Sequence, residues 1–170
     1  MKIAVLGYSG SGKSTLAAQL GQLYGIPVLH LDRVHFLPNW VEREAAEKRR
    51  IVADFMHGNE NWVIDGNYTK LFYNERTEQA DMIIILLFGR FACLQRVIKR
   101  YRRYKGKTRP DMGDGCSEKL DGEFIRWVLR DGRTKSKKAR FRIVCGKYPN
   151  KTVVLKNQRQ LDEFIRSLKK

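Results

Sequence analysis

Residues 3–15 read IAVLGYSGSGKST, and this stretch decides the fold class. Its apolar run Ile3–Leu6 is typical of a strand buried on both faces, the kind found inside parallel sheets. Gly7–Thr15 then fits the pattern G-x-x-x-x-G-K-[S/T], which describes a phosphate-binding loop. From Leu16 to Leu23 leucines recur at helical spacing. Because strand, loop and helix follow in the required order, a glycine-rich turn that matches by chance is the weaker interpretation.

The residue types in this loop suit the chemistry of phosphate binding. Gly7, Gly10 and Gly12 permit backbone angles that side chains forbid, and they let N–H groups approach phosphate oxygens. The helix N-terminus adds a partial positive charge. We expect Lys13 to reach the β- and γ-phosphates and the Ser14 hydroxyl to bind Mg²⁺. The predicted triphosphate site comprises Gly7, Ser9, Gly10, Ser11, Gly12, Lys13, Ser14 and Thr15.

Two acidic residues follow predicted strands. Ile26–Leu31 predicts a second buried strand that ends at Asp32, and Trp62–Ile64 predicts a third that ends at Asp65. The carboxyl ends of parallel strands face the ligand crevice, so both acids are candidate site residues. A helix cap or an ion-paired aspartate is the alternative for Asp32, and a turn without chemistry is the alternative for Asp65. The aromatic stretch His35–Trp40 either holds an acceptor or packs as a loop.

Length and composition exclude several classes of protein. A chain of 170 residues predicts about one domain, and a hydrophobic content of 42% supports a packed core. The longest apolar run, Met82–Phe88, is too short to span a membrane. Cys93, Cys116 and Cys145 are widely spaced and form no C-x-x-C pair, which favours a reducing compartment. We therefore expect a cytoplasmic protein without membrane partners.

The basic residues are concentrated in the second half of the chain. The chain has 34 lysines and arginines against 18 acids, a net charge of +16. Residues 1–85 carry 9 basic and 10 acidic side chains, whereas residues 86–170 carry 25 and 8. This asymmetry predicts an anionic partner for the second half. Three interpretations of the region near residues 101–140 are open: a mobile lid that closes over phosphates, a nucleic-acid-binding surface, and a solvated charged face.

The remaining pattern alternates strands with helices. Residues 41–56 predict an amphipathic surface helix, and Met82–Phe88 predicts a fourth, central strand. Lys151–Lys156 predicts a fifth strand, followed by a loop at residues 157–158 and a helix face over Leu161–Leu168. Such alternation predicts an α/β sandwich with right-handed crossovers.

These stretches together resemble the small P-loop kinases, among them adenylate kinase and shikimate kinase. They resemble more closely the adenylate-kinase-related family of bacterial DNA topology modulation proteins. The resemblance rests on GYSGSGKST (7–15), VLHLDRVHFLPNW (28–40), WVIDGNY (62–68), Arg76 with ADMIIILL (80–87), FACLQRVIKR (91–100) and RPDMGDGCSEKLDGEFIRW (109–127).

The resemblance implies a three-layer P-loop NTPase fold of the nucleoside and nucleotide kinase type. It implies one domain over residues 1–170, with a lid near 101–140, and a five-stranded parallel sheet in the order 2-3-1-4-5. The implied activity is phosphoryl transfer, dependent on ATP and Mg²⁺, to a small acceptor such as a nucleotide or nucleoside. The alternative is a nucleotide-regulated nucleic-acid-binding protein that affects DNA topology.

The resemblance also assigns roles to single residues. Asp32 stands in the place of an acceptor-binding acid, and His30 stands where related enzymes carry a further acid near magnesium. Asp65 begins a stretch that resembles Asp-Gly-Phe-Pro-Arg of adenylate kinases, but the arginine that holds a nucleoside monophosphate is missing from it. Arg76 is the candidate substitute.

Arg96 and Arg100 share a helix face and match a pair of which one arginine lies near adenine and the other near phosphates. Asn157 lies where a loop would meet adenine. Further lid candidates are Arg130, Arg133 and Arg140. The predicted catalytic residues are Lys13, Asp32, Asp65 and Arg100, and the nucleotide site gains Arg96 and Asn157.

Overall fold

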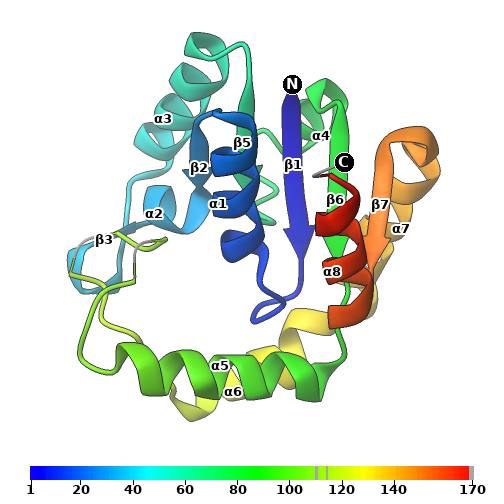
Figure 1. Cartoon of the computed structure of the whole chain (residues 1–170). Coiled ribbons are helices and arrows are strands. Elements are labelled where there is room, and N and C mark those ends of the chain that lie inside the picture. The colour runs from blue at the N-terminus through cyan, green and yellow to red at the C-terminus, as the bar shows by residue number, and fades with distance from the viewer. Residues whose placement is uncertain (110, 114, 169–170) are drawn as a thin grey trace.

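The strands of the central sheet run in parallel and end at one edge, where the glycine-rich loop lies (Figure 1). The computed structural model describes residues 1–109, 111–113 and 115–168. The sheet strands are β1 (Lys2–Gly7), β2 (Val28–His30), β5 (Trp62–Asp65), β6 (Met82–Leu86) and β7 (Thr152–Leu155). Their order across the sheet is β2-β5-β1-β6-β7.

When all strands of the chain are numbered in sequence, the order in the sheet is 2-5-1-6-7, not the expected 2-3-1-4-5. The numbering differs because two short strands, β3 (Phe36–Leu37) and β4 (Val41–Glu42), form a separate antiparallel hairpin. The sequence analysis expected only an aromatic stretch there. Strands of two residues have no detectable periodicity, so the hairpin was missed.

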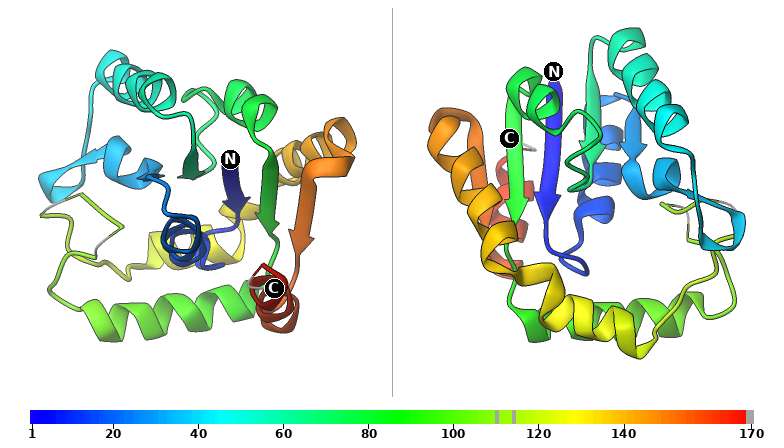
Figure 2. Two further views of the ribbon diagram at one scale, coloured as in Figure 1. Left: turned by 45° about the horizontal axis from the view of Figure 1, so that its top comes forward. Right: turned by 180° about the vertical axis from the view of Figure 1, so that it is seen from behind.

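Helices cover both faces of the sheet, which gives the three layers that the resemblance implied. Helices α1 (Lys13–Tyr24) and α8 (Gln158–Ser167) lie on one face, and α4 (Tyr73–Gln79) and α7 (Lys135–Lys147) lie on the other (Figures 1 and 2). Helix α3 (Ala45–Gly58) lies beyond the β2 edge. The central strands β1 and β6 are buried on both faces, as their apolar runs predicted.

Two helices cross beneath the carboxyl edge of the sheet. They are α5 (Arg90–Tyr104) and α6 (Gly122–Leu129), which lie apart from the strands in the right view of Figure 2. Between them the chain makes two isolated bridges, Lys105 with Glu118 and Thr108 with Ser117. The predicted lid region thus comprises the end of α5, this connection, α6, and the start of α7. Residues 110 and 114, which belong to the stretch 109–127, lie outside the described residues.

Several boundaries differ from the sequence-based expectations. The second strand ends at His30 rather than at Asp32, which lies in a short helix, α2 (Leu31–His35). Helix α3 begins at Ala45, because the Glu44 side chain caps it by accepting the Glu47 N–H. Asn157 and Gln158 do not form a loop: Gln158 begins α8, and Asn157 is its N-cap. Among the helices of the described residues, none combines the length and the apolar character that a membrane crossing needs.

The buried β6 strand should carry a large share of the stability. We expect Ile84→Ala to lower the free energy of unfolding by about 2–5 kcal/mol, because Ile84 is fully buried and the substitution leaves a cavity. The matched control Ile143→Ala, at a site that is 66% exposed, should change it by at most about 0.5 kcal/mol. Urea denaturation of both variants measures the difference, and equal losses would contradict this description of the core.

Candidate functional site

The loop between β1 and α1 leaves backbone N–H groups open toward the cleft. Gly7 and Gly10 have positive φ angles of 138° and 77°. A Cβ at Gly7 would lie 2.3 Å from the Leu86 carbonyl oxygen, so another residue would not fit there. Gly12 is the N-cap of α1 and has no side chain with which to cap it. The first N–H groups of α1 are therefore available to an anion, as the motif predicted.

Lys13 and Ser14 are the first residues of helix α1, and both line the cleft. The Lys13 ammonium donates a hydrogen bond to the Tyr8 carbonyl at 3.1 Å, which holds it against the loop. Burial lowers the pKa of Lys13, while the charges of Asp32 and Asp65 offset part of this shift. The Ser14 hydroxyl donates to Asp65 Oδ2 at 2.9 Å. The phosphate loop and both acids are thus within electrostatic range of each other.

Asp65 is a buried carboxylate, not a turn residue without contacts. It ends β5, is 4% exposed, and accepts from Ser14 with one oxygen. Its other oxygen lies 2.5 Å from His30 Nδ1 at the end of β2. Burial alone would lower the pKa of His30, but the hydrogen bond and the charge of Asp65 outweigh it and raise that pKa. Asp65 therefore joins three parts of the fold at the carboxyl edge.

Asp32 lies in the first turn of α2 and faces the same cleft. Its Oδ1 accepts a hydrogen bond of 2.7 Å from the Tyr68 hydroxyl, which comes from the loop after β5. Burial, followed by the charge of Asp32, raises the pKa of Tyr68 far above its usual value, so this phenol stays protonated. Among the described residues, the hydrogen-bond donor to Asp32 is thus a neutral hydroxyl rather than a cation.

Arg76 does not take the role of a phosphate-holding arginine. It is fully buried, and its guanidinium donates to the carbonyls of Leu71, Gly66 and Tyr68 at 2.8, 3.3 and 3.1 Å. Burial lowers its pKa to about 10, which leaves it charged at neutral pH. The sequence-based assignment of Arg76 was therefore wrong: the side chain shapes the loop after β5 from within the core.

Arg96 and Arg100 of α5 line the cleft. Arg96 donates to the Ser11 carbonyl at 2.5 Å and also bonds Gln158 of α8. Arg100 donates from Nε to Glu118 at 2.8 Å, and its Nη2 lies 2.7 Å from the same carboxylate. Glu118 also forms an ion pair with Arg109 at 2.5 Å. Sequence reasoning missed Glu118, which is one of five acids between residues 111 and 123.

Of the other residues predicted for the site or the lid, some line the cleft and some do not. Asn157 accepts the Gln160 N–H at 3.0 Å as a helix cap, and Gln158 lines the cleft instead. Arg133 donates to the Phe88 carbonyl at 2.9 Å and stacks over Tyr8, whereas Arg140 lines the cleft. Arg130 is exposed and is not among the residues that line the cleft.

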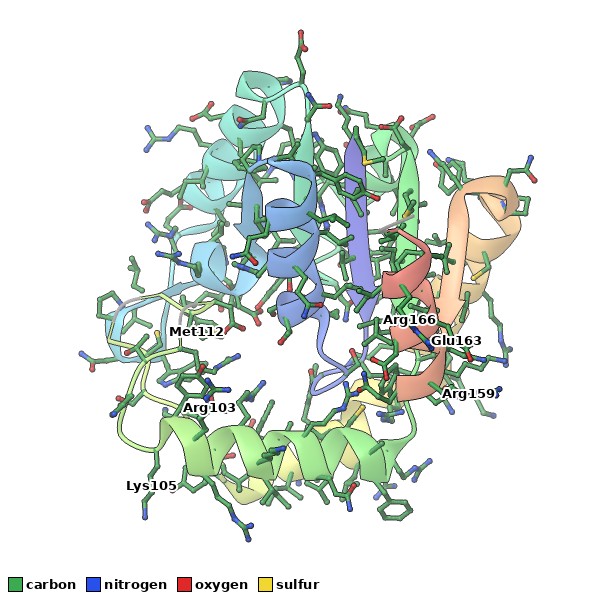
Figure 3. The ribbon with its side chains drawn as sticks, viewed as in Figure 1. Arg103, Lys105, Met112, Arg159, Glu163 and Arg166 are labelled. Atoms are coloured by element: carbon green, nitrogen blue, oxygen red, sulfur yellow. The ribbon has the colours of Figure 1, made fainter. Side chains whose placement is uncertain are left out.

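A cleft of about 1840 Å³ brings the main candidates together. Its lining includes Lys13, Ser14, Asp32, Asp65, Arg96 and Arg100, and also Trp127 of α6, which was not predicted. Trp127 Nε1 donates to the hydroxyl of Ser9 in the phosphate loop at 3.2 Å. In Figure 3, Arg103 points from α5 into this space below Met112, while Lys105 points away from it. The cleft therefore lies between the sheet edge and the crossing helices.

No family model and no curated protein matches this chain. Solved structures do match it along nearly its whole length. The chain is 18% identical to a deoxyadenosine kinase from M. mycoides with bound dATP, with all of both chains covered and a TM-score of 0.59. It is 18% identical to TT1252 from Thermus thermophilus, with 99% of this chain and 94% of the other covered and a TM-score of 0.57.

A second structure of the M. mycoides deoxyadenosine kinase, with dCMP and a flexible dCDP bound, is 16% identical. It covers 99% of each chain with a TM-score of 0.51. At these identities the comparisons show a shared fold alone, and it agrees with the P-loop kinase fold that the resemblance implies. Membership of the DNA topology modulation family is not shown by them.

The contact between His30 and Asp65 should make stability depend on pH. Because the folded-state pKa of His30 is raised, its contribution is complete below its unfolded pKa of about 6.5 and is lost as pH rises through the folded value. We therefore expect the stability lost by His30→Asn to be larger at about pH 5.5 than at about pH 9. Urea denaturation with a chelator present measures both losses; a larger loss at high pH would contradict this assignment.

Arg76→Met tests the structural role of the buried guanidinium. The substitution keeps an unbranched apolar stem but removes the guanidinium, which leaves three carbonyls without their donor, so we expect it to destabilise the fold by about 3 kcal/mol or more. Denaturant unfolding measures the loss. An unchanged midpoint, together with weaker binding of a phosphorylated acceptor, would return Arg76 to the role first expected.

Proposed function

We propose that this protein is a kinase that transfers the γ-phosphoryl group of ATP, with Mg²⁺, to a small acceptor such as a nucleotide or nucleoside. One observation carries the proposal: Lys13 and Ser14 of a phosphate-binding loop share a cleft with the carboxylates Asp32 and Asp65. The shared fold with a deoxyadenosine kinase that binds dATP agrees with this function. In this assignment residues 1–170 form one kinase domain whose basic segment near 101–140 acts as a lid.

The triphosphate would lie along the loop and the first turn of α1. The loop's N–H groups and the uncapped helix N-terminus would hold the phosphates, and Lys13 would turn from the Tyr8 carbonyl toward them. Arg96 is already fixed against the Ser11 carbonyl beside this loop. The nucleotide-binding residues would be Gly7, Ser9, Gly10, Ser11, Gly12, Lys13, Ser14, Thr15 and Arg96, with Asn157 near the base through the start of α8.

The residues present fit a magnesium ion. The Ser14 hydroxyl and the Asp65 carboxylate supply adjacent oxygen atoms at the loop, and hard divalent cations prefer oxygen ligands. Ser14 would bind the ion directly, with Asp65 beside it. When bound, the ion would neutralise charge on the phosphates.

Catalysis would depend on positioning and electrostatics, since phosphoryl transfer needs little covalent chemistry from the protein. Lys13 and Arg100 would neutralise the charge that develops on the transferred group; a contribution of this kind from an arginine reaches about 10³–10⁵ in rate. Glu118 holds Arg100 through Nε and Nη2, so its Nη1 edge remains for the phosphate. Asp32 would receive the acceptor's hydroxyl proton, and Asp65 would organise the loop.

The nucleic-acid alternative has less support from the structure. It depends on free arginines, but several are engaged within the protein. Arg100 and Arg109 pair with Glu118, Arg126 pairs with Asp131, and Arg133 bonds the carbonyls of Val128 and Phe88. A steep loss of DNA affinity with salt would be the result that favours this alternative.

Lys13→Ala tests the proposed site. ADP release from Mg·ATP should be stimulated by a pool of nucleosides, nucleoside monophosphates, hydroxy acids and 5′-hydroxyl oligonucleotides. The substitution should reduce that release by about 10³-fold or more, because the charge at the transferred phosphate is lost. The urea midpoint should stay nearly unchanged, and Lys135→Ala, an exposed site at the start of α7, should behave as wild type. Full turnover in Lys13→Ala would contradict the site.

A further inference from the structure

The acceptor half of the cleft combines a carboxylate with a cluster of aromatic rings. We propose that the acceptor is an uncharged nucleoside, which offers a hydroxyl group and a flat ring but no phosphate. This inference rests on the proposed kinase function and narrows its substrate class. It is carried by the contacts of Asp32 and Tyr68 and by the rings and charges around them.

Asp32 is placed to bind a hydroxyl group next to the transferred phosphate. Asp32 and Lys13 line the same cleft, where the charge of Asp32 offsets part of the lowering of the Lys13 pKa by burial. Tyr68 occupies Oδ1 with a hydrogen bond of 2.7 Å and fixes the carboxylate's orientation. Oδ2 of this half-buried, cleft-lining carboxylate remains for an acceptor hydroxyl.

Four aromatic rings line the cleft beside this carboxylate: His35, Phe36, Trp40 and Tyr68. The His35 ring lies 4.6 Å from the Tyr68 ring and 4.6 Å from the Phe36 ring, and Phe36 packs edge-on against Trp40 at 5.2 Å. Burial and the nearby Lys48 lower the pKa of His35, so its ring is neutral at neutral pH. Such a cluster suits a flat heterocycle, because stacked and edge-on ring contacts are favourable.

The charges in this half of the cleft argue against a phosphate on the acceptor. Lys48 pairs with Glu42 at 2.5 Å, and Arg109 is shared between Glu118 and Asp111. Arg49 donates to the Lys70 carbonyl. The negative Asp32 would repel an acceptor phosphate, and these cations are already neutralised or engaged.

Arg103 and Lys119 also line the cleft, and among the described contacts neither has an acid as its partner. The Lys119 ammonium lies over the Trp40 ring at 5.3 Å. Arg103 lies in the last turn of α5 and contacts the ring of Tyr104 at 5.4 Å (Figure 3). Arg103 is therefore the side chain that would hold an acceptor phosphate if this inference is wrong.

The step balances without any further reactant. The acceptor hydroxyl oxygen attacks the γ-phosphorus and forms the new P–O bond, while the bond from that phosphorus to the β,γ-bridging oxygen breaks. The electron pair of the broken bond stays on the bridging oxygen, which leaves as part of the nucleoside diphosphate. The hydroxyl proton passes to the Asp32 carboxylate and from there to solvent.

The experiment first measures binding of Mg²⁺ with a non-hydrolysable ATP analogue by calorimetry. It then measures ADP release from Mg·ATP with eight separate acceptors, the four common ribonucleosides and the four deoxyribonucleosides. Each is paired with its 5′-monophosphate and with the free sugar, which has the hydroxyl but no flat ring. We expect at least one nucleoside to stimulate release about tenfold more than its monophosphate and its sugar.

Variants then place the acceptor in the cleft. Asp32→Asn should lower nucleoside-stimulated release by about 100-fold or more while the analogue binds with nearly unchanged affinity. Tyr68→Phe and Trp40→Ala should raise the KM for the nucleoside by about fivefold or more, because each removes one contact of the acceptor half. Arg33→Ala is the matched control, an exposed residue next to Asp32 that does not line the cleft, and it should behave as wild type.

The outcomes separate this inference from the proposed function. Preference for a monophosphate, lost in Arg103→Ala, would overturn the inference and leave the kinase function standing. Binding of the analogue without stimulation by any nucleoside would also overturn the inference alone. Failure to bind the analogue would overturn the proposed function, and the inference with it.

Discussion

The arrangement of the site depends on the buried carboxylate of Asp65. Sheet register sets Asp65 level with Val5 of β1 and His30 of β2, so a shift of one residue would turn its side chain to the other face. Burying a carboxylate costs several kcal/mol unless hydrogen bonds replace its water. Ser14 and His30 supply those bonds, one from the phosphate loop and one from β2. The sheet, the phosphate loop and the end of β2 are thereby held in one fixed arrangement.

The parts of the fold and site that could be predicted from the sequence are those with local signals. Ile3–Thr15 combines a buried strand, three glycines and the start of a helix within a few residues. These elements follow in the order that a phosphate-binding loop requires. Asp32 and Asp65 were predicted because strand ends in a parallel sheet converge, a rule that needs no side-chain contacts. The structure places both in the cleft with Lys13 and Ser14, and it places Arg96 and Arg100 along the same space.

What could not be predicted depends on partners distant in sequence. Arg76 was expected to substitute for an arginine that the resemblance implies, but three carbonyls of the 66–71 loop accept hydrogen bonds from it. Glu118 is one of five acids between residues 111 and 123, and only the folded chain brings it between Arg100 and Arg109. Asn157 follows a strand and was assigned to a loop, yet its side chain caps α8. In each case a backbone or charged group needed a hydrogen-bond or ion-pair partner. The spacing of residues in the sequence does not show which side chain supplies it.

The net charge of the chain is therefore a poor guide to the charge of its ligand. A guanidinium that already has an acid or carbonyl partner must lose that contact before it binds a phosphate, and the loss offsets part of the gain. Lys48, Arg100 and Arg109 are in this position around the cleft. At the phosphate loop, N–H groups and Lys13 supply positive charge. At the aromatic end Lys48 and Arg109 are paired with acids, while Lys119 lies over the Trp40 ring. The paired cations at the aromatic end support the proposal of an uncharged acceptor there, opposite an anionic donor at the phosphate loop.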